Sequence, residues 1–131
     1  MARKELRYIA LDSKYKIGEN QLAKMLGDSA NQTREMLKGD FSDIERYILE
    51  VSFGDIYNRS GLDLRLREVI TLSSLISQGA SSGQIRLHMI SLLNLGFAKE
   101  ELIELIIQCI PNVGFPKVLD AVTIAKEVFD S

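Results

Sequence analysis

The sequence has very few of the residues from which metal and redox sites are usually built. Its 131 residues include one cysteine and one histidine. Because Cys109 is alone, an intramolecular disulfide, a Cys-x-x-Cys redox pair and a cysteine-rich zinc site are all excluded. A metal site would have to combine the one histidine with scattered carboxylates, so we expect no metal. The lack of paired cysteines also favours a reducing cytoplasm.

An excess of one charge and long apolar runs are missing as well. The chain carries 16 basic and 18 acidic residues and has a pI of about 5.4, which provides no broad basic surface for nucleic acid or an anionic membrane. Residues 1–16 lack the apolar core of a signal peptide, and no later run reaches about 18 apolar residues. Glycine-rich nucleotide-binding motifs and the nucleophile elbow of serine hydrolases are also absent. We therefore expect a soluble cytoplasmic protein that binds neither nucleic acid nor a membrane.

Helical spacing of apolar residues is the pattern that the chain does have, and no strand pattern competes with it. The length fits one domain over residues 1–131, for which we expect an all-α fold. Residues 1–40 are polar and mixed in charge, and we expect them to form an accessory helical arm. The core is expected in residues 41–131.

The first helix of this core is predicted from its start and stop signals. Ser42 and Glu45 have the spacing of a capping box, and Gly54 is expected to end the helix. A loop over residues 54–63 should follow, with Arg59 near its centre. The apolar stripe of this helix is predicted to consist of Ile44, Tyr47, Ile48, Val51 and Phe53.

Two long helices with a short connection are predicted for the centre of the chain. The first covers residues 62–77, has Asp63 as its cap, and changes from polar to apolar at Glu68. The connection GASSG, residues 79–83, leads to a second helix over residues 84–97. So short a link between long helices favours an antiparallel hairpin.

Two further helices complete the prediction. One covers residues 99–110 and should end at Pro111, and the last begins at residue 117. The residues of the first of these two that we expect to be buried are Leu102, Ile103, Leu105, Ile106 and Ile110.

The only histidine lies on a narrow polar line in the otherwise apolar second helix of the hairpin. Gln84, His88 and Ser91 are spaced i, i+4 and i+7, so they share one helix face. A buried helix with one polar line is typical of a pocket wall. In an antiparallel hairpin Glu68 could face His88. Ser81 and Gln84 also have capping-box spacing, and Gly96 should end the helix.

A histidine near a glutamate and several arginines suits the binding of an anion together with proton transfer. His88 could instead be a core histidine bonded for structural reasons, and Glu68 could simply pair with the arginines that precede it. The arginines concerned are Arg59, Arg65, Arg67 and Arg86.

Three segments, taken in order, resemble the carboxymuconolactone decarboxylase family: LDLRLREVITLSSL, QIRLHMISLLNLGFAKEELIELIIQ and GFPKVLDAV. The resemblance covers roughly residues 50–130. Its most specific elements are Arg67-Glu68, Leu87-His88 followed by Asn94 and Gly96, the run ending at Glu104, and Gly114-Phe115-Pro116.

That family is related to alkylhydroperoxidase D, so the resemblance implies an alkylhydroperoxidase D-like helical bundle with a central antiparallel helix hairpin. By resemblance, Glu68 and His88 match the glutamate and the histidine of the peroxidase site of that relative. Its two cysteine positions fall on Ser81 and Gln84 here. Dithiol peroxidase chemistry is therefore not expected.

The resemblance implies a decarboxylase without a cofactor. The reaction of the family converts 4-carboxymuconolactone to 3-oxoadipate enol-lactone in bacterial aromatic degradation, and a close relative could act on another small organic acid. His88 and Glu68 would be catalytic, and the substrate-binding residues would be Arg59, Arg67, Arg86, Ser81 and Gln84. Asn112 stands where relatives often have tyrosine. The alternatives are a peroxide-metabolising relative without the cysteine pair and a non-catalytic oligomeric binding protein.

The surplus of apolar residues predicts self-association. Hydrophobic residues make up 46% of the chain, and the helices at 66–77, 85–95 and 102–110 each show more than one apolar face. We expect a homo-oligomer, and the resemblance implies a trimer or a hexamer. Its pocket would lie near a subunit boundary, where Arg59 could reach the site of a neighbouring subunit.

Overall fold

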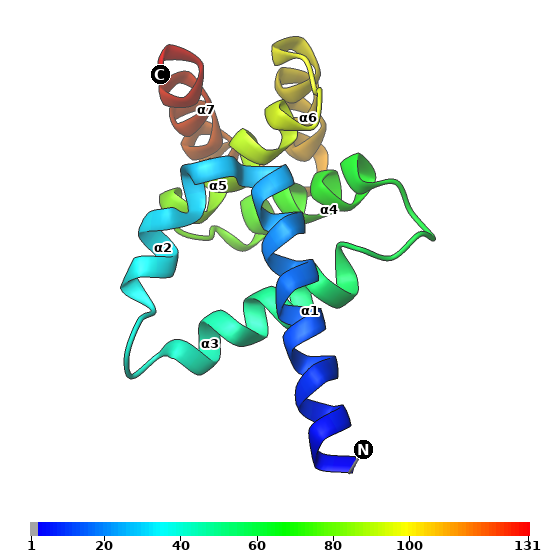
Figure 1. Cartoon of the computed structure of the whole chain (residues 1–131). Coiled ribbons are helices and arrows are strands. Elements are labelled where there is room, and N and C mark those ends of the chain that lie inside the picture. The colour runs from blue at the N-terminus through cyan, green and yellow to red at the C-terminus, as the bar shows by residue number, and fades with distance from the viewer. Residues whose placement is uncertain (1–2) are drawn as a thin grey trace. The chain divides into compact units, whose positions relative to one another are not determined.

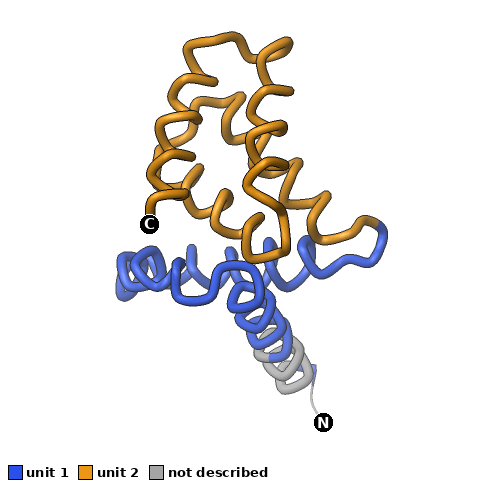
Figure 2. Tube along the Cα trace, turned by 90° about the horizontal axis from the view of Figure 1, so that it is seen from above, with its two compact units in different colours: residues 1–61 blue, residues 62–131 orange. Residues whose placement is uncertain are grey.

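Helices account for all the regular structure in the part of the chain that the structure describes. The computed structural model describes the backbone of residues 3–131 and the side chains of residue 3 and residues 13–131. Within these limits there is no strand, which confirms the predicted all-α fold. The chain divides into two compact units, residues 1–61 and residues 62–131 (Figure 2).

The elements follow one another along the chain as Figure 1 shows. Unit 1 contains α1 (Arg3–Leu26), the 3₁₀ turn η1 (Gly27–Ala30), α2 (Asn31–Met36), α3 (Ser42–Tyr47) and the π-helical segment η2 (Ile48–Ile56). Unit 2 contains α4 (Leu64–Gln78), α5 (Ser82–Asn94), α6 (Lys99–Val113) and α7 (Phe115–Asp130).

Unit 1 is built on a close crossing of α1 and η2. A Cβ atom added to Gly18 would lie 1.8 Å from the carbonyl oxygen of Leu49, and one added to Gly54 would lie 2.9 Å from that of Lys14. Both neighbours are backbone atoms, so a larger residue at either position would have to push the two helices apart. Glycine is therefore required at this crossing for its size.

The segment before and within η2 departs from the predicted helix. The N–H of Tyr57 donates to the carbonyl of Ser52, five residues earlier, as in a π-helix. The wider turn changes which residues face inward, so Phe53 of the predicted stripe is buried while Tyr47 is 61% exposed. The helical backbone also continues past Gly54 to Ile56. The remaining exposed members of the predicted stripe are Ile44 and Val51.

The predicted capping box at the start of this region is wrong. Ser42 is the first residue of α3, and the cap position is held by Phe41, whose side chain makes no cap hydrogen bond. Phe41 lacks a hydrogen-bonding side chain, so here the box pattern lies one residue too late to cap the helix.

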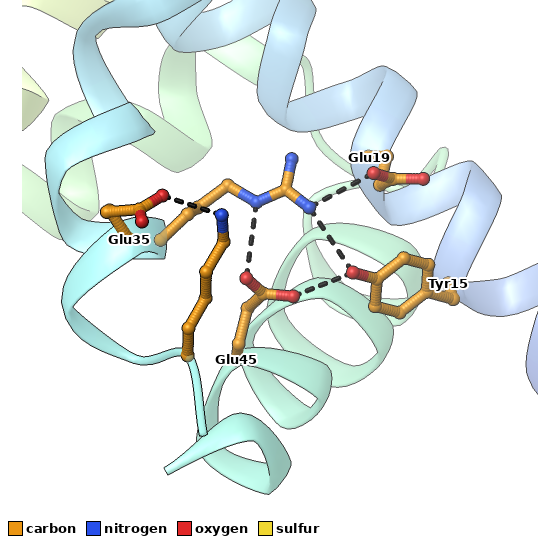
Figure 3. A network of polar contacts seen from close by, with 6 residues as sticks. Tyr15, Glu19, Glu35 and Glu45 are labelled. Carbon is orange, nitrogen blue, oxygen red and sulfur yellow. Dashed lines mark hydrogen bonds and ion pairs between the residues drawn. The ribbon is translucent and has the colours of Figure 1, made fainter. Parts of the chain in front are cut away.

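A polar network centred on Arg34 joins α1, α2 and α3 (Figure 3). The guanidinium of Arg34 donates to Glu19 at 3.0 Å, to the hydroxyl of Tyr15 at 3.2 Å and to Glu45 at 3.5 Å. The hydroxyl of Tyr15 in turn donates to Glu45 at 2.7 Å, and this bond to a carboxylate raises the pKa of Tyr15. Burial alone would lower the pKa of Arg34, but its carboxylate partners raise it above the ordinary value. The network thus fixes α2 against the helices on either side of it in the sequence.

The hairpin of unit 2 forms from the predicted signals. Asp63 accepts a hydrogen bond from the N–H of Arg65 at 2.6 Å and so caps α4, which therefore starts at residue 64 rather than 62. Ser81 caps α5 by accepting from the N–H of Gln84, and α5 then starts at residue 82 rather than 84. Gly96 follows the end of α5 with a φ of 95°, the left-handed conformation that glycine adopts readily.

The C-terminal hairpin differs from the prediction at Pro111. Pro111 lies inside the last turn of α6, and the helix ends two residues later at Val113, before Gly114, whose φ is 86°. A proline there removes a single hydrogen bond near an exposed helix end, so the helix continues past it. α7 consequently begins at Phe115 rather than at residue 117. Ile103, predicted to be buried, is 38% exposed.

The core of unit 2 draws side chains from all four of its helices. One face of each helix contributes, and Leu72, Met89, Leu102 and Ala121 have no exposed surface. This core holds the α4–α5 hairpin, on which the candidate site lies.

Candidate functional site

Glu68 and His88 are brought together by the α4–α5 hairpin. Nδ1 of His88 forms a hydrogen bond with Oε1 of Glu68. The side chain of Glu68 is fully buried, and that of His88 is 12% exposed. Two residues that lie 20 positions apart in the sequence thus form one pair because the hairpin is antiparallel. The expectation that they face one another is confirmed.

This contact determines what the imidazole can do. The carboxylate holds Nδ1, so Nε2 is the nitrogen that remains for a ligand, and no described residue forms a hydrogen bond with it. A histidine oriented in this way can accept a proton at Nε2, and the buried carboxylate stabilises the imidazolium that results. The pair therefore has the geometry of a proton-transfer group.

Four buried polar atoms of the hairpin lack a partner among the described residues, and two of them belong to residues that are themselves fully buried. These two are Oε2 of Glu68 and Oγ of Ser91, and both residues have an exposed fraction of 0%. Buried polar atoms are nearly always hydrogen-bonded, so two without a partner on one hairpin mark a site that the protein itself does not complete. Ser91 belonged to the predicted polar line but not to the predicted site. Its burial depends on tertiary packing, which the sequence does not reveal.

The four arginines considered for anion binding fall into two groups. Arg86 forms an ion pair with Glu127, and Arg65 pairs with Glu101 at 3.4 Å and lies over the ring of Phe97. The other two are Arg59, an exposed residue of unit 1, and Arg67, which precedes Glu68 on α4.

Arg67 is the arginine of unit 2 that is best suited to bind a carboxylate. The Nε atoms of Arg65 and Arg67 are both buried without a hydrogen-bond partner, but Arg67 forms no ion pair with any residue in the described part of the chain, whereas Arg65 pairs with Glu101. A guanidinium with unused donors can bind a carboxylate through two parallel hydrogen bonds.

The remaining predicted site residues have structural roles or lie at the surface. Ser81 accepts the capping bond of α5, and Gln84 is exposed on the first turns of the same helix. Their predicted contact with a substrate stays a prediction.

Comparison with known proteins agrees with this arrangement. The sequence profile of the carboxymuconolactone decarboxylase family matches residues 42–127, which include both Glu68 and His88. The chain belongs to the carboxymuconolactone decarboxylase family.

Two relatives are similar in sequence to this chain. The chain is 30% identical to 4-carboxymuconolactone decarboxylase of Acinetobacter baylyi over 119 residues, which are 90% of this chain and 88% of the relative. It is 35% identical to an uncharacterised 15.0 kDa protein of Paracoccus denitrificans over 83 residues, which are 63% of this chain and 62% of the relative.

An open groove between α4 and α6 is a second feature of this family member. Its volume is about 830 Å³, within the range of small-molecule sites, but neither Glu68 nor His88 lines it. The groove was not predicted from the sequence, because its walls come from two helices that share no motif. Its lining residues are Val69, Ser73, Ser74, Ser77, Phe97, Glu100, Glu101, Glu104, Leu105, Gln108, Cys109, Asn112 and Val113.

Neither a metal site nor a membrane-spanning helix is found among the residues that the structure describes. No group of three or more histidine, cysteine, aspartate and glutamate side chains is placed to hold a metal ion there. None of the helices in this part of the chain has both the length and the apolar character needed to cross a membrane.

Cys109 is expected to react slowly and to take no part in turnover. Burial raises the pKa of its thiol, although a hydrogen bond with Ser73 acts in the opposite direction. A higher pKa leaves less thiolate at pH 7, and the side chain is only 7% exposed. Alkylation by iodoacetamide, followed by mass spectrometry, should be at least tenfold slower in the folded protein than in urea. Cys109→Ser should change kcat/KM by less than twofold, and a large loss of peroxide consumption in this variant would contradict the expectation.

Proposed function

We propose that this protein is a decarboxylase that acts without a cofactor on a carboxymuconolactone-like unsaturated lactone acid or another small organic acid. The buried pair of Glu68 and His88 is the observation that carries the proposal. It supplies an oriented proton-transfer group in a chain that is 30% identical to a 4-carboxymuconolactone decarboxylase over 90% of its length.

The chemistry asks little of the protein beyond positioning and one proton. When the bond between carbon and the carboxylate breaks, carbon dioxide leaves and the bonding electrons pass into the conjugated lactone as an enolate. A donor near the enolate oxygen stabilises the developing charge. The imidazolium of His88 then gives the proton on Nε2 to carbon and becomes neutral, and solvent returns that proton. Glu68 keeps the imidazole oriented throughout because Nδ1 is bonded to Oε1.

Turnover is tested by measuring carbon dioxide directly. Purified protein is incubated with 4-carboxymuconolactone and a panel of unsaturated acids, in buffer with a chelator, and the gas is measured by mass spectrometry. One equivalent of carbon dioxide per substrate, released faster than in buffer alone, is the expected result. Binding of the acids by calorimetry without release from any of them would favour the non-catalytic binding protein instead.

Arg67→Met is expected to raise KM by about tenfold or more with little change in kcat, because it removes a charge-assisted contact made equally in the bound substrate and the transition state. Steady-state kinetics with the best acid of the panel provide the measurement. Arg65→Met is the matched control on the same helix, since that guanidinium already pairs with Glu101. Equal effects of the two variants would remove the proposed role of Arg67.

Self-association is part of the same proposal. Leu66 and Ile70 on α4 are 52% and 56% exposed, and Phe115 and Leu119 on α7 are 64% and 61% exposed. Such side chains at helical spacing favour a partner surface, for which a second copy of the chain is the simplest source. We expect a trimer or hexamer by light scattering at micromolar concentration. A stable species of 14.7 kDa would contradict this part of the proposal.

A further inference from the structure

The hydroxyl of Ser91 has no hydrogen-bond partner among the described residues, unlike two other helical hydroxyl groups of unit 2. The hydroxyls of Thr71 and Thr123 each donate to the carbonyl four residues earlier, at 3.1 Å and 3.2 Å. Such a bond satisfies a hydroxyl within its own helix. Ser91 is fully buried and does not make it, so its hydroxyl is available to another group.

Oε2 of Glu68, on the facing helix, likewise has no hydrogen-bond partner in the described part of the chain. Oε1 is bonded to His88, whereas Oε2 is buried and has no donor among the residues described. Ser91 follows His88 by three residues on α5, a spacing that places the two Cβ atoms about 5–6 Å apart on one face of the helix. Glu68 and Ser91 are therefore both neighbours of His88, one across the hairpin and the other along α5.

We propose that Oε2 of Glu68 and Oγ of Ser91 together bind one hydroxyl group, either that of a buried water molecule or that of a substrate. An ionised carboxylate oxygen only accepts, so the bound group must donate to it. The hydroxyl of Ser91 can donate to the oxygen of the same group, and a hydroxyl is the smallest group that does both. The inference rests on the proposed function only in that it extends the same site.

The bound hydroxyl makes Ser91 a positioning residue. A second hydrogen bond at Oε2 fixes the plane of the carboxylate and so keeps Oε1 directed at Nδ1 of His88. Ser91 acts on the imidazole through this chain of contacts and does not touch the reacting carbon.

The signals of the only histidine report on this chain of contacts without any substrate. Ser91→Ala is expected to shift the imidazole nitrogen resonances of His88, because the carboxylate bonded to Nδ1 loses part of its support. Ser74→Ala, at an exposed position of α4, is the matched control and should leave them unchanged. If the hydroxyl belongs to a substrate, the shift should appear only with malate bound, so resonances unchanged in both variants without and with malate would overturn the inference.

Thermal unfolding provides a second comparison between the same variants. Both replacements gain the same helix propensity, so the difference between them isolates the buried hydroxyl. Ser91→Ala should unfold about 3–5 °C below Ser74→Ala if its hydroxyl is bonded. A melting temperature equal to that of Ser74→Ala or above it, both without a ligand and with saturating malate, would mean that the hydroxyl has no partner, and the inference would fail.

Crystals of the unchanged protein distinguish the two sources of the hydroxyl. A water oxygen within hydrogen-bond distance of both Oε2 and Oγ in the free protein assigns the position to water. Its absence there, with the hydroxyl of soaked malate at the position while soaked succinate leaves it empty, assigns it to a substrate. No atom at the position in any of the three crystals would overturn the inference. None of these measurements uses turnover, so their failure is distinct from failure of the proposed decarboxylation.

Discussion

His88→Ala is expected to lower kcat/KM for the decarboxylated acid by about 10²–10⁴-fold, which is the usual contribution of a positioned acid or base. Glu68→Gln should also lower kcat/KM, because the amide cannot stabilise the imidazolium at Nδ1 as a carboxylate does. Steady-state kinetics give the effect, and far-UV circular dichroism checks that the helices remain.

Glu104→Gln is the matched control for the loss of a carboxylate. Glu104 is exposed on α6 and lines the α4–α6 groove instead of the His88 pair. Its replacement should change kcat/KM by less than twofold. If Glu104→Gln were the damaging change and His88→Ala kept near-normal kinetics, the reaction would belong to the groove and the assignment of the pair would be wrong.

Gly18→Ala is expected to destabilise unit 1 by about 3 kcal/mol, near the upper end of typical overpacking effects. The added methyl carbon would lie 1.8 Å from the carbonyl oxygen of Leu49, a backbone atom that can move only if α1 and η2 separate. Urea unfolding followed by circular dichroism measures the change in the free energy of unfolding.

Gly61→Ala is the control within the same unit. Nothing lies within 4 Å of a Cβ atom at Gly61. Its replacement should change the free energy of unfolding by no more than about 1 kcal/mol. A small increase in stability is expected, because alanine lowers the conformational entropy of the unfolded chain. Equal stabilities of the two alanine variants would contradict the close crossing.

Local signals in the sequence were sufficient to predict the hairpin and its pair. The caps at Asp63 and Ser81 and the glycine at position 96 depend on neighbouring backbone groups, so the spacing of residues specifies them. The short link then makes the two helices antiparallel, which brings Glu68 to His88. These features depend on local contacts and not on distant packing.

The features that the sequence did not reveal depend on tertiary structure. The π-helical turn of η2 changes the helical period, so a stripe counted at 3.6 residues per turn placed Tyr47 and Val51 on the wrong face. Pro111 is tolerated because its position is the last turn of α6. The uncompleted hydroxyl of Ser91 becomes visible only when the helices that bury it are in place.

The most direct test of the central claim, that ligands act at the His88–Glu68 pair, is a titration of the imidazole signals by nuclear magnetic resonance. Because the chain has one histidine, these signals need no assignment by mutation. The account predicts that an acid which the protein decarboxylates slowly shifts these signals in a saturable way. The dissociation constant from the titration should be close to the inhibition constant of the same acid when it competes with a faster substrate. Saturation binding that leaves the His88 signals unchanged, while backbone signals of α4 and α6 along the groove move, would contradict it.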